Sequence, residues 1–177
     1  MTFLLEKEKK LVRIPNEYGV SPLGYILRGD GNFIQGDETA LRIAALHLLI
    51  DSGADVHEKN EYGLTDLFYV SGNDAPAMIE VLLSSGADMN QKSSTPYPDS
   101  FCDVDFALPA GSTALDEFEA LLEVIPSIGD FDSYRKVVGE TIRVLKKHGA
   151  VNGAWAAQKR SSSMIYSISN AATASSR

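Results

Sequence analysis

The sequence predicts an all-α protein made of stacked helix–turn–helix units. Three observations lead to this prediction: two short motifs recur three times in the same order, apolar residues between them recur at helical spacing, and 44% of the 177 residues are hydrophobic. One helical pair of this size cannot bury its own apolar face, so neighbouring pairs must cover one another. The repetition therefore predicts one cooperative stack.

The first motif marks a turn and the start of a helix. It reads NEYGVSPL at 16–23, NEYGLTDL at 60–67 and, more weakly, AGSTAL at 110–115. Thr65 and Thr113 are good N-cap residues, and an apolar face begins after each. Each copy therefore predicts a turn followed by the first helix of a unit.

The second motif closes each unit. It reads LLIDSGADVH at 48–57, VLLSSGADMN at 81–90 and VLKKHGAVN at 144–152. In every copy a glycine follows the apolar run, and glycine adopts without steric cost the left-handed backbone that ends a helix. Each copy therefore predicts the end of a second helix.

The helices between the motifs carry their own signals. In the second unit Asp74 can cap a helix, and Pro76 fits its first turn. Apolar stripes at helical spacing are formed by Met78, Ile79, Leu82 and Leu83, by Leu115, Phe118, Leu122 and Ile125, and by Val138, Ile142 and Leu145.

The two motifs together resemble the ankyrin repeat, a unit of about 33 residues with a β-turn and two antiparallel helices. SPLG, TDLF and TALD, which begin at Ser21, Thr65 and Thr113, stand where that family has Thr-Pro-Leu-His. The closing motifs stand where it has Gly-Ala-Asp-Val-Asn. The resemblance implies an ankyrin-repeat solenoid with long finger and loop insertions. The expected parts are an N-terminal capping segment (1–15), three repeats (about 16–57, 60–90 and 110–152), an insertion (91–109) and a C-terminal tail (153–177).

Only the second unit keeps the spacing of that family. Thr65 to Gly86 spans the 21 residues that the family pattern requires, whereas the first and third units are 11 and 15 residues longer. These extra residues predict long links inside the two units. The insertion at 91–109 stands where the family has its β-hairpin finger. Segments that depart from a repeat are where function is expected.

The composition argues against several kinds of chemistry. One cysteine and three histidines exclude a disulfide framework and argue against a structural zinc site. No nucleophile elbow or phosphate-binding glycine loop has the required spacing. The longest apolar run, residues 43–50, is too short to cross a bilayer, and the N-terminus does not read as a signal peptide. We expect a cytoplasmic protein that is not an enzyme, without catalytic residues, cofactor, metal or membrane partner.

The charge is distributed unevenly along the chain. Residues 16–149 hold 22 of the 24 acidic residues but 9 of the 16 basic ones, a net charge of −13. Such a field repels the phosphates of nucleic acid, and it attracts and steers a basic protein. The sequence therefore favours a protein partner with a basic surface and no nucleic acid; ordinary solubility is the alternative explanation.

The insertion at 91–109 is the first candidate binding surface. Interfaces draw most of their energy from a few aromatic or arginine anchors within a polar rim. The expected anchors are Tyr97, Phe101 and Phe106, with Asp99, Asp103 and Asp105 around them and with Tyr18, Glu61 and Tyr62 at neighbouring turn tips. Alternatively, the two phenylalanines pin the loop to the stack.

A second candidate is an acidic helical face formed by Asp116, Glu119 and Glu123. Their i, i+3, i+7 spacing places three like charges together, which costs an isolated helix ~0.2–0.5 kcal/mol per pair. Such a pattern could serve binding; the alternative is a solvated face.

The resemblance implies a protein–protein interaction module, because ankyrin-repeat proteins generally bind other proteins. The acidic stack and the acidic, aromatic insertion favour an inhibitor or immunity-type protein that neutralises a basic toxin or nuclease. The alternatives are a bacterial or viral effector or scaffold that recruits a host protein, and an enzyme with an unfamiliar site. A fold does not fix a function, so this step is an analogy.

Overall fold

The computed structural model describes residues 11–17, 20–28, 38–98, 107–125 and 131–162. Most of this part of the chain is helical, which confirms the predicted all-α class. The elements are α2 (Pro22–Arg28), α3 (Glu38–Asp51), the 3₁₀ helix η1 (Asp66–Tyr69), α4 (Ala75–Ser84), β1 (Tyr97–Pro98), β2 (Ala107–Leu108), α5 (Ala114–Val124) and α6 (Asp132–Lys147). Residues 154–162 are also helical.

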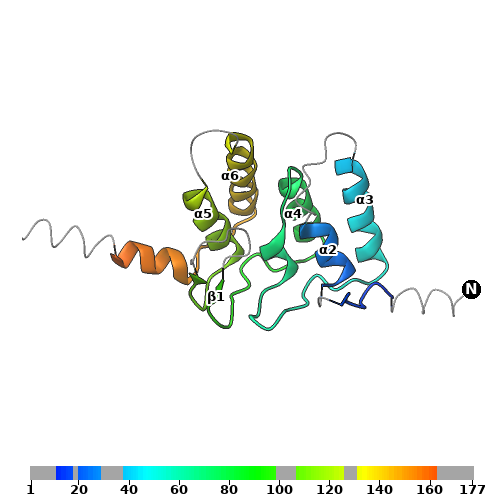
Figure 1. The fold of residues 1–177 in the computed structure, drawn as a ribbon, viewed down its shortest axis with the longest axis horizontal. Helices are drawn as coiled ribbons and strands as arrows, with labels where there is room; N and C mark the ends of the chain where they lie inside the picture. The colour runs from blue at the N-terminus through cyan, green and yellow to red at the C-terminus, as the bar shows by residue number, and fades with distance from the viewer. Residues whose placement is uncertain (1–10, 18–19, 29–37, 99–106, 126–130, 163–177) are drawn as a thin grey trace, which may run out of the picture.

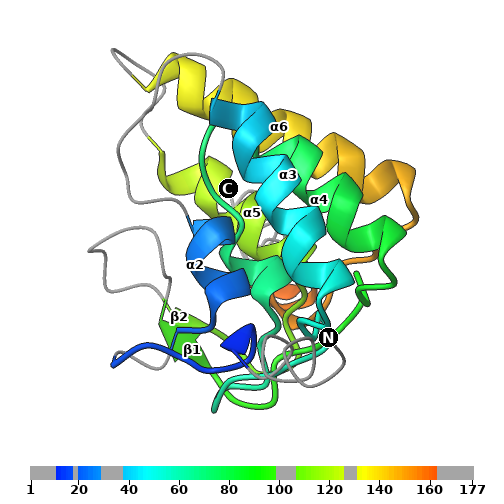
Figure 2. The same cartoon turned by 90° about the vertical axis from the view of Figure 1, so that its right-hand side faces the viewer.

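The helices lie in two layers (Figures 1 and 2). In one layer α4 packs between α3 and α6, and in the other η1 packs between α2 and α5. The layers are joined because α2 packs on α3 and α5 packs on α6. Consecutive units therefore lie side by side in chain order, as the repeated motifs predict.

The apolar core lies between the layers and runs through all three units. Side chains from both layers are almost fully buried, among them Leu23, Leu27, Leu46, Leu67, Phe68, Met78, Ile79, Leu82, Leu115, Phe118, Val138 and Leu145. Burying a side chain of this size contributes ~1.5–3 kcal/mol. Leu83 and Leu122, which the sequence places in the same stripes, are only partly buried.

The three closing motifs form the same turn. Gly53, Gly86 and Gly149 have φ angles of 97°, 91° and 94°, where residues with a side chain are strained. The alanine after each glycine donates its N–H to a carbonyl five residues earlier, at 2.9–3.0 Å. This is the glycine-dependent helix end that the sequence predicts at all three positions.

The first two opening motifs also share a turn. The N–H of Asn16 donates to the carbonyl of Val20 at 2.9 Å, and the side-chain oxygen of Asn16 accepts the N–H of Val20 at 3.0 Å. Asn60 makes both bonds with Leu64, each at 3.0 Å. The repeated sequence therefore encodes a repeated turn.

Two local expectations need correction in the second unit. Its first helix is the four-residue η1, which ends before Val70. The N–H of the following Ser71 donates to the carbonyl of Leu27 in the first unit at 2.9 Å, so the chain leaves η1 toward its neighbour. Asp74 stands at the N-cap of α4, but its carboxylate makes no cap bond and accepts from Arg42 instead.

Candidate functional site

An acidic turn follows α3. We use this name for residues 51–61, where Asp51, Asp55, Glu58 and Glu61 are exposed and Lys59 is the one lysine. The turn is held from within, since the carboxylate of Asp55 accepts the N–H of His57 at 2.9 Å. At its far end the side-chain oxygen of Asn60 accepts the N–H of Tyr62 at 2.9 Å. The carboxylates are therefore presented on an ordered backbone.

Several carboxylates elsewhere in the described chain are paired with basic side chains. Glu80 contacts Lys147 at 3.1 Å and His148 at 2.6 Å, and these two bonds lower the pKa of its carboxyl group. Further ion pairs join Glu119 to Lys146, Glu123 to Lys159, Glu140 to Arg143 and Asp74 to Arg42. Within the described residues, none of the four carboxylates of the acidic turn forms an ion pair. Their negative charge is therefore exposed to solvent without a paired positive charge from the described residues.

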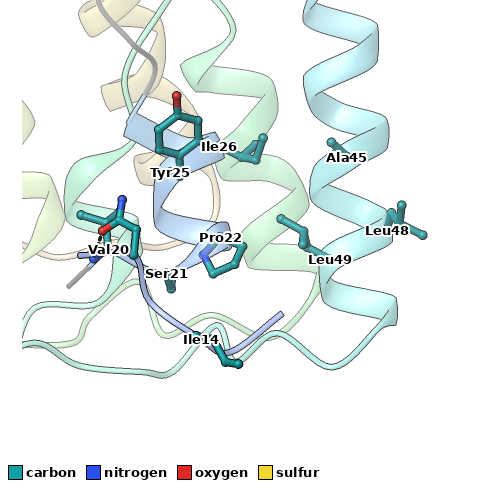
Figure 3. Close-up of a pocket in the computed structure, with 10 residues that line it drawn as sticks. Ile14, Val20, Ser21, Pro22, Tyr25, Ile26, Ala45, Leu48 and Leu49 are labelled. Carbon is teal, nitrogen blue, oxygen red and sulfur yellow. Dashed lines mark hydrogen bonds between the residues drawn. The ribbon is translucent and has the colours of Figure 1, made fainter. Parts of the chain in front are cut away.

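An apolar groove lies at the same end of the stack (Figure 3). It encloses ≈ 520 Å³ and has one wall on α2 and another on α3, where Pro22 and Leu49 lie opposite each other. Its lining consists of Ile14, Asn16, Val20 and Ser21 before α2, Pro22, Tyr25 and Ile26 from α2, and Ala45, Leu48 and Leu49 from α3.

The groove and the acidic turn are neighbours. The guanidinium of Arg13 donates to the carbonyl of Gly53 at 2.8 Å, which ties the segment before α2 to the turn. Ile14, the next residue, lines the groove, and Leu48 in its other wall precedes Asp51 by less than one helical turn. A partner could contact both surfaces at once.

The structure corrects the expected role of Tyr97. Its ring is 2% exposed and packs edge-on against Phe68, with the ring centroids 6.0 Å apart. Burial raises the pKa of the Tyr97 phenol, and the Glu117 carboxylate beside it adds to the rise. Tyr97 pairs with Leu108 across the two short strands, so it anchors the base of the insertion to the core. The other residues expected there, Asp99, Phe101, Asp103, Asp105 and Phe106, lie outside the described residues, as does Tyr18.

The expected acidic face of α5 is exposed only at Glu123, which pairs with Lys159. Asp116 is 0% exposed and accepts the N–H groups of Thr113 and Gly153, at 3.0 and 2.7 Å. Glu119 accepts from the side chain of Asn152 at 2.8 Å and pairs with Lys146 at 2.7 Å. The residues after α6 cover this part of α5. They supply the hydrogen-bond donors that a buried carboxylate needs. Asp116 is therefore a structural acceptor that fixes the start of the 154–162 helix.

The two described residues expected at a turn tip, Glu61 and Tyr62, differ in exposure. Glu61 is exposed in the acidic turn, and Tyr62 is half-buried, with its carbonyl accepting the N–H of Ser94 at 2.9 Å. Sequence reasoning missed Asp51, Asp55, Glu58 and the apolar groove. A local count of charge, four acids against one lysine in 51–61, would have found the first three. The sequence signal for the α3 wall of the groove was the run 43–50, which is apolar except for His47.

No protein-family model matches the chain, and no curated protein is significantly similar to it. In the described ranges, no three His, Cys, Asp or Glu side chains are grouped so that they could hold a metal ion. None of the described helices is both long and apolar enough to cross a membrane.

Proposed function

We propose that the chain is a degenerate ankyrin-type repeat protein, and that it binds a partner protein with a basic surface through the acidic turn. The repeat assignment is supported by three equal glycine turns and two equal asparagine turns. The binding proposal is carried by one observation: the four exposed carboxylates that lie together in residues 51–61 have no ion-pair partner among the described residues, whereas the carboxylates of Glu80, Glu123 and Glu140 do.

The physical basis of this binding is electrostatic complementarity. Unpaired charges on an exposed turn attract an oppositely charged surface and speed its approach. A partner of this kind is a basic toxin or nuclease, whose phosphate-binding groups the carboxylates would occupy. This would make the protein an inhibitor or immunity-type protein.

The test is binding to a panel of basic nucleases and toxins, with acidic proteins of similar size for comparison. Association and dissociation rates are measured by surface plasmon resonance at low and high salt, together with nuclease activity. We expect a member of the basic set to bind and to be inhibited. The double variant Glu58→Gln, Glu61→Gln should slow association several-fold at low salt, since exposed charges act mainly on the association rate.

Glu58→Gln and Glu61→Gln are also made singly, and Glu140→Gln is the matched control for each single variant. It removes the same unit of charge from an exposed glutamate, but that glutamate lies on α6 and pairs with Arg143. The control should leave the association rate within about twofold of wild type. An equal effect of the control and of the single acidic-turn variants would show that only net charge matters, which would contradict the proposed site.

A further inference from the structure

We infer that the apolar groove and the adjoining outer face of α3 bind an amphipathic helix of the partner, with lysine or arginine residues along the edges of its apolar stripe. The inference rests on the proposed function. It adds the chemistry of the bound segment and a second contact surface.

The outer face of α3 is apolar and uncovered in the described structure. Leu41 and Leu48 are 69% and 68% exposed, and they lie two helical turns apart on one side of the helix. The opposite side buries Leu46 in the core. Because both sides of α3 are apolar, the helix resembles one that has neighbours on both sides, although it lies at the end of the described stack.

Exposed apolar side chains are concentrated at this end. Seven large hydrophobic side chains are exposed in the described chain, and five of them lie within residues 11–48: Leu11, Ile14, Tyr25, Leu41 and Leu48. Single exposed residues of this kind are ordinary, but Ile14, Tyr25 and Leu48 line one groove together. An apolar surface gathered in this way marks an interaction site.

The groove requires that the occupant bring an apolar face. Besides Tyr25, its polar lining residues are Asn16 and Ser21, whose side-chain oxygens already accept backbone N–H groups, from Val20 and Gly24 at 3.0 Å each. The groove thus provides a concave apolar surface that fits a stripe of apolar side chains. A helix with apolar residues at i, i+3, i+4 and i+7 supplies such a stripe.

The acidic residues around the groove determine which kind of helix is attracted to it. Glu17 and Asp51 are exposed beside the two walls, and the acidic turn follows directly. The lysine and arginine side chains that the structure describes there are Arg13 and, within the acidic turn, Lys59, so the acidic residues outnumber them. A second copy of the chain, itself at net −8, would bring like charge to this rim. A helix with basic flanks is attracted instead.

The test uses a fluorescently labelled synthetic peptide of about 18 residues, five helical turns, with a leucine stripe flanked by lysines. Fluorescence anisotropy measures its affinity for the full-length protein. We expect wild type to bind it, and Leu48→Asp and Tyr25→Asp to weaken binding about tenfold or more, since burial of one such side chain has that magnitude. Val151→Asp is the matched control: it adds the same charge at a side chain that is 55% exposed outside the groove, and its affinity should match wild type within about twofold.

Three results would overturn the inference. They are equal binding of a peptide with glutamates in place of the lysines, unchanged binding by a folded Leu48→Asp variant, and sedimentation of wild type as a dimer that Leu48→Asp dissociates. The last result would assign the face to a second copy. If the peptide fails to bind while Glu58→Gln, Glu61→Gln still slows association of a basic nuclease, the helix inference fails and the proposed function stands.

Discussion

Arg42 and Arg135 make equivalent contacts in the first and third units. Arg42 on α3 donates to the carbonyl of Ile26 near the end of α2 at 2.6 Å, and Arg135 on α6 donates to the carbonyl of Leu122 near the end of α5 at 2.9 Å. The last carbonyls of a helix have no partner within it and carry its negative dipole end. Both units have long links between their helices, so an arginine from the second helix serves the first.

Arg42 should be important for stability, because it also pairs with Asp74 at 2.5 Å. The Asp74 side chain is 3% exposed, and removing its partner would leave a buried carboxylate uncompensated. Arg42→Met should therefore lower the free energy of unfolding by about 3 kcal/mol, measured by urea titration. Arg143→Met, which removes an arginine that is 71% exposed, should change it by less than about 0.5 kcal/mol. A smaller loss in the double variant Arg42→Met, Asp74→Asn would identify the buried charge as the cause.

Asp66 should make stability depend on pH. Burial raises the pKa of its carboxyl group to about 6. The charge of Arg28 lowers this pKa in part, and the charge of Glu58 raises it further. A raised pKa means that the folded state holds the proton more tightly than the unfolded state does. The resulting contribution to the free energy of unfolding is fully present below about pH 4 and is lost as the pH rises through 6. Asp66→Asn should therefore stabilise the protein at pH 7.5, by up to about 3 kcal/mol, and have little effect near pH 4. Equal effects in urea titrations at the two pH values would contradict the shift.

Gly153 should be essential for docking the 154–162 helix. A side-chain carbon at this position would lie 2.3 Å from the carbonyl oxygen of Gly111 and 2.7 Å from the carboxylate of Asp116. Gly153→Ala should therefore displace the helix and expose Trp155, which is 9% exposed and is the single tryptophan of the chain. The expected readout is a red shift of tryptophan emission at a denaturant concentration where wild type is folded.

Gly139→Ala is the control for this substitution. Gly139 lies within α6 with no atom within 4 Å of the added carbon, so alanine should stabilise the helix by up to about 1 kcal/mol. Its tryptophan emission should match wild type. A red shift in the control, or none in Gly153→Ala, would contradict the steric explanation.

The candidate surfaces could be predicted only in part. Glu61 and Tyr62 were expected at a turn tip, where local sequence places them. Asp116 was expected on an open face because its spacing to Glu119 fits a helix, but spacing within a helix does not show what packs on it. The donor to Asp116 from Gly153 lies 37 residues further along the chain. Tyr97 was expected to contact a partner, yet Phe68 and β2 enclose it.

The sequence by itself determined the local and periodic features of this protein. The glycines at 53, 86 and 149, the asparagines at 16 and 60 and the apolar stripes act over a few residues, so their pattern alone predicts turns, helix ends and the order of stacking. Only the tertiary structure decided which charges are paired and which apolar faces stay open. Arg42 meets Asp74 32 residues away, and Glu80 meets His148 68 residues away, while Leu48 meets no equivalent helix on its outer side in the described stack. Pairing and exposure depend on which segments share a surface, and that relation arises only when the units pack.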